Sequence, residues 1–384
     1  MAGSDAGHAF PALALGKLFA RAGDEVLVYT GSDWIGEGPR CGVRVLPLPG
    51  LAALPGEDDD DAGAKLNARA ARMAVMLAPA LATEGVELVF SDVITRAGGW
   101  AAELAGVPWI EVSPHPLYEQ SAGLPPIGSG LAVGTGVRGR LRDAGLRILC
   151  AKSASDGVRA TARARGGLRL PPVPAPAARF VATLPGLEVH RPDWPPRTHL
   201  IGPLLHEPTD AVFDRPPGDG PLVVVAPSTA RIGEAELGAV ALEALNDLDG
   251  RRGLRTVYSA LSALADGVTT PGRFVAGTAR QDEVLADAAV AVCGAGHGML
   301  VKALGAGVPV VTVPGGGDQW ELAKRVKRSG CGLIVRPAEP KALAAAIERI
   351  LDDPSFAANA QAVAATASST VDPVRVARRV LEDE

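Results

Sequence analysis

The sequence has few cysteines, few aromatic residues and no long apolar run. Its four cysteines lie far apart without a C-x-x-C pair, so the pattern indicates neither a zinc site nor a disulfide framework. No stretch approaches the roughly 20 apolar residues that cross a bilayer, and the N-terminus lacks a secretory signal pattern. A formal net charge of -5 gives no overall attraction for phosphate backbones. We therefore expect a cytoplasmic protein with reduced thiols and no nucleic-acid partner.

The chain is rich in hydrophobic residues and long enough for two domains. It has 384 residues, of which 47% are hydrophobic and 21% charged. Strand-type and helical runs alternate along it, which is typical of parallel βαβ units. The first half has expected strands at 25–30, 43–48, 87–90 and 109–112, and expected helices at 10–22, 64–81 and 98–105. The second half has expected strands at 222–226, 254–259, 273–276, 288–293 and 308–313. The fold class predicted is α/β, with two Rossmann-like domains whose parallel sheets face a cleft.

A proline-rich segment separates the two halves. Prolines crowd residues 171–221, which excludes long helices there and indicates an extended connection. We therefore predict a first domain over residues 1–195, a linker over 196–220 and a second domain over 221–384.

Two charged segments each allow more than one interpretation. Residues 138–169 are helical in pattern and rich in arginine, which suits contact with an anionic membrane surface. A helix whose arginines reach into solvent is the favoured alternative. The acidic run Glu57–Asp61 contains the letters D-x-D of some cation sites, but we expect a solvated loop there.

The most informative segment is a glycine-rich turn between a strand and a helix. Residues 290–314 contain a strand, the turn Gly294–Met299, a helix and a second strand. A turn with so few side chains lets backbone N–H groups approach a ligand, and the start of the helix favours an anion such as a diphosphate. Gly315–Gln319 then follows the second strand and places Asp318 and Gln319 where sugar hydroxyls can bind.

Together these segments resemble the donor-binding signature of the UDP-glycosyltransferase-like family, inverting GT1-type enzymes with the GT-B fold that include bacterial natural-product glycosyltransferases. The family pattern is a strand, H-G-G-x-G-T, a helix, A-x-G-V-P-x-V and P-x-x-x-D-Q, and Gly294 to Gln319 follows its spacing without a break. Residues 2–11 resemble the family's G-H-x-x-P segment, in which His8 falls on the catalytic base. Asp92 falls on the aspartate that pairs with that histidine.

The resemblance implies a reaction and a set of donor-site residues. A sugar would pass with inversion from a UDP-sugar or dTDP-sugar to a hydroxyl of a small, lipophilic acceptor, without a metal or other cofactor. The first domain would bind the acceptor, the C-terminal helix near residues 373–384 would pack back on it, and the protein would be a monomer or homodimer. The candidate donor-binding residues are Ser228, Gln281, Gly294, Ala295, Gly296, His297, Gly298, Met299, Asp318 and Gln319.

The chain departs from the family pattern in three places. The histidine and threonine that contact the diphosphate fall on Gly294 and Met299, which removes two side-chain contacts. The asparagine usually found after Asp-Gln is missing from Trp320–Leu322. The hydrophobic strand that opens the family's first sheet is also missing before Gly3. Either upstream residues are omitted, which we favour, or the first sheet lacks an interior strand.

These departures leave other functions open. A degenerate relative would bind a sugar nucleotide or a partner without turnover. A nucleotide-sugar epimerase or hydrolase on the same fold is a further alternative. For His297, contact with a phosphate and capping of the turn are equally favoured.

Overall fold

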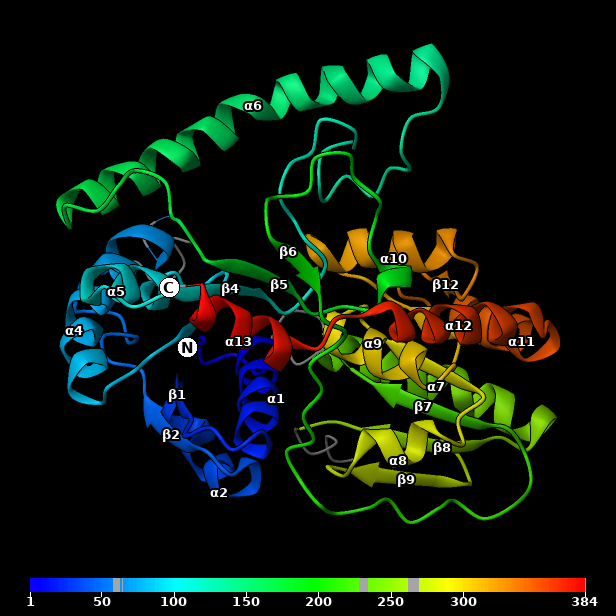
Figure 1. The fold of residues 1–384 in the computed structure, drawn as a ribbon. Coiled ribbons are helices and arrows are strands. Elements are labelled where there is room, and N and C mark those ends of the chain that lie inside the picture. Colours follow the sequence, from blue (N-terminus) through cyan, green and yellow to red (C-terminus); the bar gives the residue numbers. More distant parts are fainter. Residues whose placement is uncertain (58–62, 64, 228–233, 262–268, 384) are drawn as a thin grey trace.

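The computed structural model describes residues 1–57, 63, 65–227, 234–261 and 269–383, and it contains two α/β domains (Figure 1). Ser228 and residues 58–61 of the acidic run lie outside the described residues. In the part that is described, every pair of neighbouring strands is parallel.

The N-terminal domain contains two separate parallel sheets. Its strands are β1 Leu27–Thr30, β2 Arg44–Pro47, β3 Val89–Asp92, β4 Trp109–Ser113, β5 Ala178–Val181 and β6 Thr198–Leu200. One sheet is β1-β2 and the other has the order β3-β4-β5-β6. Its helices are α1 Ala6–Arg21, η1 Ser32–Glu37, α2 Gly38–Cys41, η2 Lys65–Arg69, α4 Ala70–Thr83, α5 Ala97–Ala105, α6 Gly136–Gly167 and η3 Pro185–Leu187.

The proline-rich segment contributes more to this domain than the sequence suggested. Both β5 and β6 lie between residues 171 and 221, and β6 falls inside the segment predicted as linker. They extend the sheet through the parallel pairs β4–β5 and β5–β6. The prediction that residues 171–221 contain no long helix agrees with the structure, because the one helical segment described in this range is the short η3.

The C-terminal domain has one six-stranded sheet covered by helices on both faces. Its strands are β7 Leu222–Ala226, β8 Arg255–Ser259, β9 Phe274–Gly277, β10 Val290–Cys293, β11 Val310–Thr312 and β12 Gly332–Ile334, in the order β12-β11-β10-β7-β8-β9. Its helices are α7 Glu234–Arg252, α8 Gln281–Leu285, α9 His297–Gly305, α10 Asp318–Arg328, α11 Pro340–Asp352, α12 Ser355–Ala365, η4 Thr366–Ser369 and α13 Pro373–Glu382.

Side chains of this sheet alternate between two buried cores. Val224 packs with α9 and α10 on one face, whereas Val223 and Val225 pack with α7 and α11 on the other. The chain leaves β7 towards β8 and β9 and then returns to β10 on the other side of β7. Such a reversal opens a crevice at the carboxyl ends of the two strands, where ligands bind in open α/β sheets.

The C-terminal helix α13 lies on the N-terminal domain, next to α1 (Figure 1). Val376 and Ala377 belong to the same buried cluster as Leu15 and Phe180. Arg378 also donates to Asp24 at 2.7 Å. The last turns of the chain therefore link the two domains.

Helix α6 extends away from the rest of the N-terminal domain (Figure 1). Of its residues only Asp143 and Arg165 are buried. The buried Arg165 is 2.5 Å from Glu103, so it does not belong to the basic surface expected from the sequence. Within the described residues, no helix is long and apolar enough to cross a membrane.

Candidate functional site

His8 and Asp92 form a close pair in the N-terminal domain. His8 lies in the first turn of α1, which begins at Ala6 and not at Phe10 as expected, because the N–H groups of His8 and Ala9 both bond to Asp5 C=O at 2.9 Å. Asp92 is the last residue of β3. Nδ1 of His8 is 2.7 Å from Oδ2 of Asp92, and the two side chains are 18% and 5% exposed. The structure therefore brings the two predicted catalytic residues together.

Backbone donors hold the Asp92 carboxylate in place. Its Oδ1 accepts from the N–H groups of Ile94 and Thr95 at 2.9 and 3.0 Å, which leaves Oδ2 for His8. Burial by itself lowers the pKa of His8, but the hydrogen bond and negative charge of Asp92 outweigh it, so the net pKa is raised. With Nδ1 engaged, Nε2 is the ring nitrogen left to meet a substrate.

A second histidine lies beside this pair. The rings of His8 and His115 are 6.2 Å apart in an edge-on arrangement, and His115 stacks on Tyr118 at 4.4 Å. Burial lowers the pKa of His115, whose Nδ1 lies 2.8 Å from Pro116 C=O. A neutral, fixed ring therefore forms one wall next to His8.

The glycine-rich turn leads directly from β10 into α9. Ala295 adopts a left-handed conformation with φ of 62°, which is uncommon for a residue with a side chain. Gly296 is the N-cap, and the N–H of Leu300 bonds to its C=O at 3.1 Å. The preceding N–H groups, of His297, Gly298 and Met299, belong to the first turn, which has no intrahelical acceptors. The turn thus presents backbone donors and the positive end of a helix.

His297 contacts the N-terminal domain. Its Nε2 lies 2.9 Å from Oγ1 of Thr183, between β5 and η3. Burial lowers the pKa of His297 to about 3, so the ring is neutral at pH 7. It therefore bridges the two domains at the start of α9, a role not anticipated from the sequence.

The remaining donor candidates sit at the starts of α8 and α10. Gln281 donates to Ser259 at 3.0 Å and accepts from Lys302 Nζ at 2.9 Å. Gln319 accepts from Gly315 N–H at 2.9 Å, while Asp318 is exposed at the first position of α10.

A cavity of about 430 Å³ between the two domains brings most of these residues together. His8 lines it from the N-terminal domain. From the C-terminal domain it is lined by Gln281, Gly294, Gly296, His297, Gly298, Met299, Asp318 and Gln319. Asp92 and Ala295 are not among the residues that line it, and Ser228 is outside the described residues. The catalytic and binding roles of these residues stay predictions.

Sequence reasoning missed a charged pair in the same cavity. Lys302 and Glu207 both line it, with Nζ 2.8 Å from Oε1 of the glutamate. Lys302 lies four residues after Gly298 on α9, so helical spacing was a usable signal for it. Glu207 follows β6 with no local pattern to mark it. In the described ranges, no cluster of three His, Cys, Asp or Glu side chains is arranged to hold a metal ion.

Comparison with known sequences matches the chain to one protein family and to individual glycosyltransferases and related enzymes. Residues 255–382 match the family described as erythromycin biosynthesis protein CIII-like, C-terminal domain. The chain is similar to 4'-demethylrebeccamycin synthase of Lentzea aerocolonigenes, with 25% identity over 92% of this chain and 91% of that protein. UDP-glucosyltransferase 1 of Beauveria bassiana is 28% identical to this chain over 45% of the chain's length. The matched region spans 40% of that relative's length.

Solved structures share the overall fold. The glycotransferase of kitacinnamycin superposes with a TM-score of 0.74 at 20% identity, over 96% of this chain and 94% of that one. A Streptomyces sp. SF2575 glycosyltransferase complexed with thymidine diphosphate superposes with a TM-score of 0.68 at 21% identity, over 98% of both chains. The predicted GT-B fold and the resemblance to natural-product glycosyltransferases are confirmed.

Proposed function

We propose that this chain, a GT-B glycosyltransferase of the natural-product type, moves a sugar from a nucleoside diphosphate sugar to a hydroxyl of a small, lipophilic acceptor with inversion. One observation carries this proposal. His8, held by Asp92, and the open first turn of α9 come from different domains and line the same cavity.

His8 would act as the general base. A hydroxyl has a pKa far above 7, so its proton must leave as its oxygen attacks the anomeric carbon. Nε2 of His8 takes that proton, and the Asp92 carboxylate stabilises the imidazolium that forms. The bond from the anomeric carbon to the diphosphate oxygen breaks on the opposite face, and its electron pair leaves with the diphosphate.

The first turn of α9 would receive the negative charge that grows on the leaving diphosphate. Its N–H groups and helix dipole are fixed before the reaction, so they need no reorganisation when the charge develops. Gly294 and Met299 offer no polar side chain there, so the backbone carries this task in our proposal. Asp318 and Gln319, at the start of α10, would bind hydroxyls of the donor sugar.

The donor class is either a UDP-sugar or a dTDP-sugar. One relative is named a UDP-glucosyltransferase and one structural neighbour binds thymidine diphosphate. No metal takes part in the proposed step, because backbone donors meet the charge. Activity that survives dialysis against a chelator would support this point, and activity restored only by a divalent cation would contradict it.

Calorimetric titration with UDP, dTDP and GDP, then with the matching sugar nucleotides, tests donor binding. Micromolar affinity for UDP or dTDP is the expected result. His8→Ala should abolish transfer and leave donor binding nearly intact, because the base belongs to the other domain. His190→Ala is the matched control, since His190 is exposed and does not line the cavity.

Other outcomes separate the alternatives. Absence of nucleotide binding would favour a degenerate protein without turnover. Release of free sugar in the absence of acceptor would favour a hydrolase. Equal loss of transfer and donor binding in His8→Ala would contradict the assigned roles.

Contact of α6 with a membrane surface is a second, separate proposal. Apolar side chains on this helix are unusually exposed, including Ile148 and Leu149 at 74% and 78%, and Arg138 and Arg140 are exposed near its start. Co-sedimentation with vesicles of anionic lipid tests it, with neutral vesicles as the control. Recovery of the same amount of protein with anionic and with neutral vesicles would contradict membrane contact and favour a helix exposed to solvent.

A further inference from the structure

Lys302 shares one face of α9 with the glycine-rich turn. It lies four residues after Gly298, and side chains four residues apart lie one above the other on a helix. Helical side chains also lean towards the start of the helix, so Lys302 is directed over Gly298. A Cβ built on Gly298 would meet no described atom within 4 Å, and both residues line the cavity between the domains. The lysine therefore stands beside open space at the first turn of α9.

Two acceptors contact the Lys302 ammonium within the part of the chain that the structure describes. Its Nζ is 2.8 Å from Oε1 of Glu207, and it donates to Oε1 of Gln281 at 2.9 Å. The side chains of Lys302 and Glu207 are 11% and 15% exposed, so the pair is largely shielded from water. An ammonium group has three N–H donors, and these two acceptors leave one donor for a further acceptor.

The partners of Lys302 have other bonds that hold them in place. Glu207, on the connection between β6 and β7, also accepts from Gln281 N–H at 3.2 Å. The Gln281 side chain donates at 3.0 Å to Ser259, the last residue of β8. Both partners therefore keep a hydrogen bond if the lysine turns to another anion.

A diphosphate attracts this lysine more strongly than one carboxylate does. A lysine ammonium is a compact positive charge that is well suited to phosphate groups. A nucleoside diphosphate sugar brings two charged phosphates, whereas Glu207 has a single negative charge, and Coulombic attraction grows with charge. The turn has no polar side chain at Gly294 or Met299. Lys302 adds a positive charge that these two positions do not provide.

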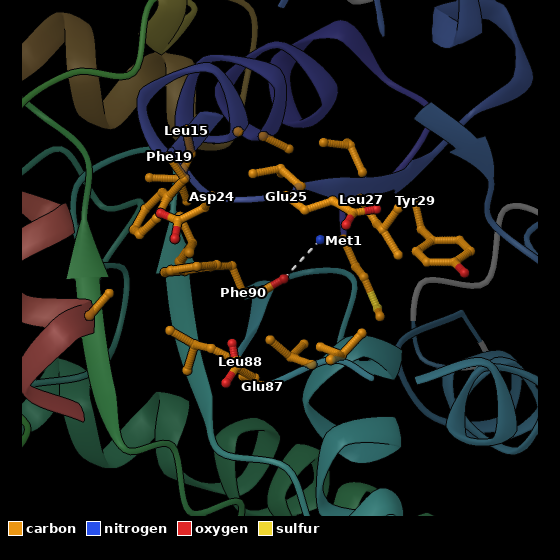
Figure 2. Close-up of a pocket in the computed structure, with 18 of the residues that line it drawn as sticks. Met1, Leu15, Phe19, Asp24, Glu25, Leu27, Tyr29, Glu87, Leu88 and Phe90 are labelled. Carbon is orange, nitrogen blue, oxygen red and sulfur yellow. Dashed lines mark hydrogen bonds between the residues drawn. The ribbon is translucent and has the colours of Figure 1, made fainter. Parts of the chain in front are cut away.

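Another cavity of the protein does not suit the same anion. It has a volume of about 330 Å³ and lies in the N-terminal domain (Figure 2). The side chains labelled in Figure 2 include the acidic Asp24, Glu25 and Glu87. Arg378 also lines this cavity, but its guanidinium donates to Asp24 at 2.7 Å. Carboxylates there would repel a diphosphate, which places the anion in the cavity that Lys302 lines.

From this geometry we propose that Lys302 binds the diphosphate of the donor, and that Glu207 is the counter-ion from which the donor takes the lysine. The inference rests on the proposed function and adds a side chain to the backbone donors of α9. An ammonium beside the diphosphate also meets the negative charge that grows as the sugar leaves. Competition from Glu207 limits the affinity for the donor.

Calorimetric titration of the parent and of Lys302→Met with UDP and dTDP is the first test. Methionine keeps an unbranched side chain and removes the charge. Loss of a hydrogen bond between charged groups should weaken binding by about 10–100-fold. Lys302→Arg should keep most of the affinity, because it keeps the positive charge. Lys341→Met is the matched control, since Lys341 is an exposed residue of α11 that does not line the cavity.

Glu207→Gln separates a phosphate ligand from a purely structural ion pair. Glutamine keeps an acceptor for Gln281 N–H but removes the charge that competes for Lys302. The nucleoside diphosphate should therefore bind about threefold tighter or more. A structural pair would instead lose affinity in both Lys302→Met and Glu207→Gln, and that result would overturn the proposal.

A double variant removes the effect of an unpaired Glu207. In Lys302→Met alone, the Glu207 carboxylate has lost its cation and itself repels the phosphates. The double variant Glu207→Gln/Lys302→Met lacks both charges, and it should still bind about 10–100-fold more weakly than Glu207→Gln. Equal affinities for these two proteins would show that the lysine does not contact the diphosphate.

Failure of this inference is distinguishable from failure of the proposed function. The thermal unfolding midpoint of each variant shows whether it is folded. If the parent binds UDP or dTDP and neither comparison shows an effect of Lys302→Met, the lysine contact is wrong while the proposed function stands. If the parent binds neither nucleotide, the proposed function fails and this inference fails with it.

Discussion

Nδ1 of His8 lies 2.7 Å from Oδ2 of Asp92, across 84 residues of sequence. The bond orients the imidazole and raises the pKa of His8. It also connects the start of α1 to the end of β3, so the base is positioned by two elements of the fold and not by a loop alone.

Asp92→Asn should therefore change both the rate and its pH dependence. The base must be neutral to accept a proton, so transfer rises with pH through the His8 pKa. Loss of the Asp92 charge lowers the pKa of His8, so the rise of the transfer rate with pH should move to lower pH. Because the imidazolium is then stabilised less, kcat should also fall by about 10²–10⁴-fold. Initial rates between pH 5 and 8 measure this. Asp33→Asn, on an exposed residue, is the control, and an unmoved acid limb would contradict the pairing.

His297 should make the protein less stable in acid. Its folded pKa is about 3, below the ordinary 6.5, so between these values the unfolded chain binds a proton that the folded chain does not. Its contribution is complete above pH 6.5 and is lost as the pH falls towards 3. The loss at pH 5 is on the order of 2 kcal/mol.

Urea unfolding of the parent and of His297→Gln at pH 7 and pH 5 isolates this contribution. The variant should lose less stability between the two pH values, because glutamine does not titrate. An equal loss in both proteins would place the sensitivity in other groups, such as His115 or His206, whose pKa values burial also lowers.

The sequence located the candidate site residues more closely than the strands of the domain around them, while the roles of those residues stay predictions. The resemblance to the family's motifs placed His8 and Asp92, and the turn before α9 also follows a buried strand that its own sequence pattern indicates. The strands β5 and β6 have four and three residues within a proline-rich stretch, where the strand signal is weak. Two contacts join residues that are far apart in the sequence: His297 with Thr183, and Lys302 with Glu207. Both depend on how the two domains pack together, which a local sequence pattern does not predict.

A buried ion pair between the domains should contribute strongly to stability. Glu188 and Arg325 are 3% and 4% exposed and 3.1 Å apart, and the Glu188 carboxylate also accepts from Leu117 N–H at 2.7 Å. Glu188→Gln keeps an acceptor for Leu117 but leaves Arg325 with less negative charge around it. We expect a loss of roughly 3 kcal/mol, since removal of one partner of a buried pair is costly.

Asp352→Asn provides the matched control for this change. It breaks the pair with Arg252, in which Oδ1 of Asp352 is 2.8 Å from Nη1 of the arginine on the surface, and should cost far less stability, because solvent screens an exposed ion pair. Denaturant unfolding measures both variants. Similar losses for the two would show that the interdomain pair contributes no more than a surface one.

Met299→Thr should strengthen donor binding if the diphosphate lies at the first turn of α9. Met299 is the third residue of that helix and lines the cavity between the domains, where a threonine hydroxyl can donate to a phosphate oxygen. A hydrogen bond to a charged group contributes about 1.5–3 kcal/mol, which corresponds to roughly 10–100-fold tighter binding of the nucleoside diphosphate. Met299→Val is the control, because it is branched like threonine but has no hydroxyl. Calorimetry should show tighter binding for the threonine variant alone, and equal affinities for the two variants would mean that the diphosphate does not reach this turn.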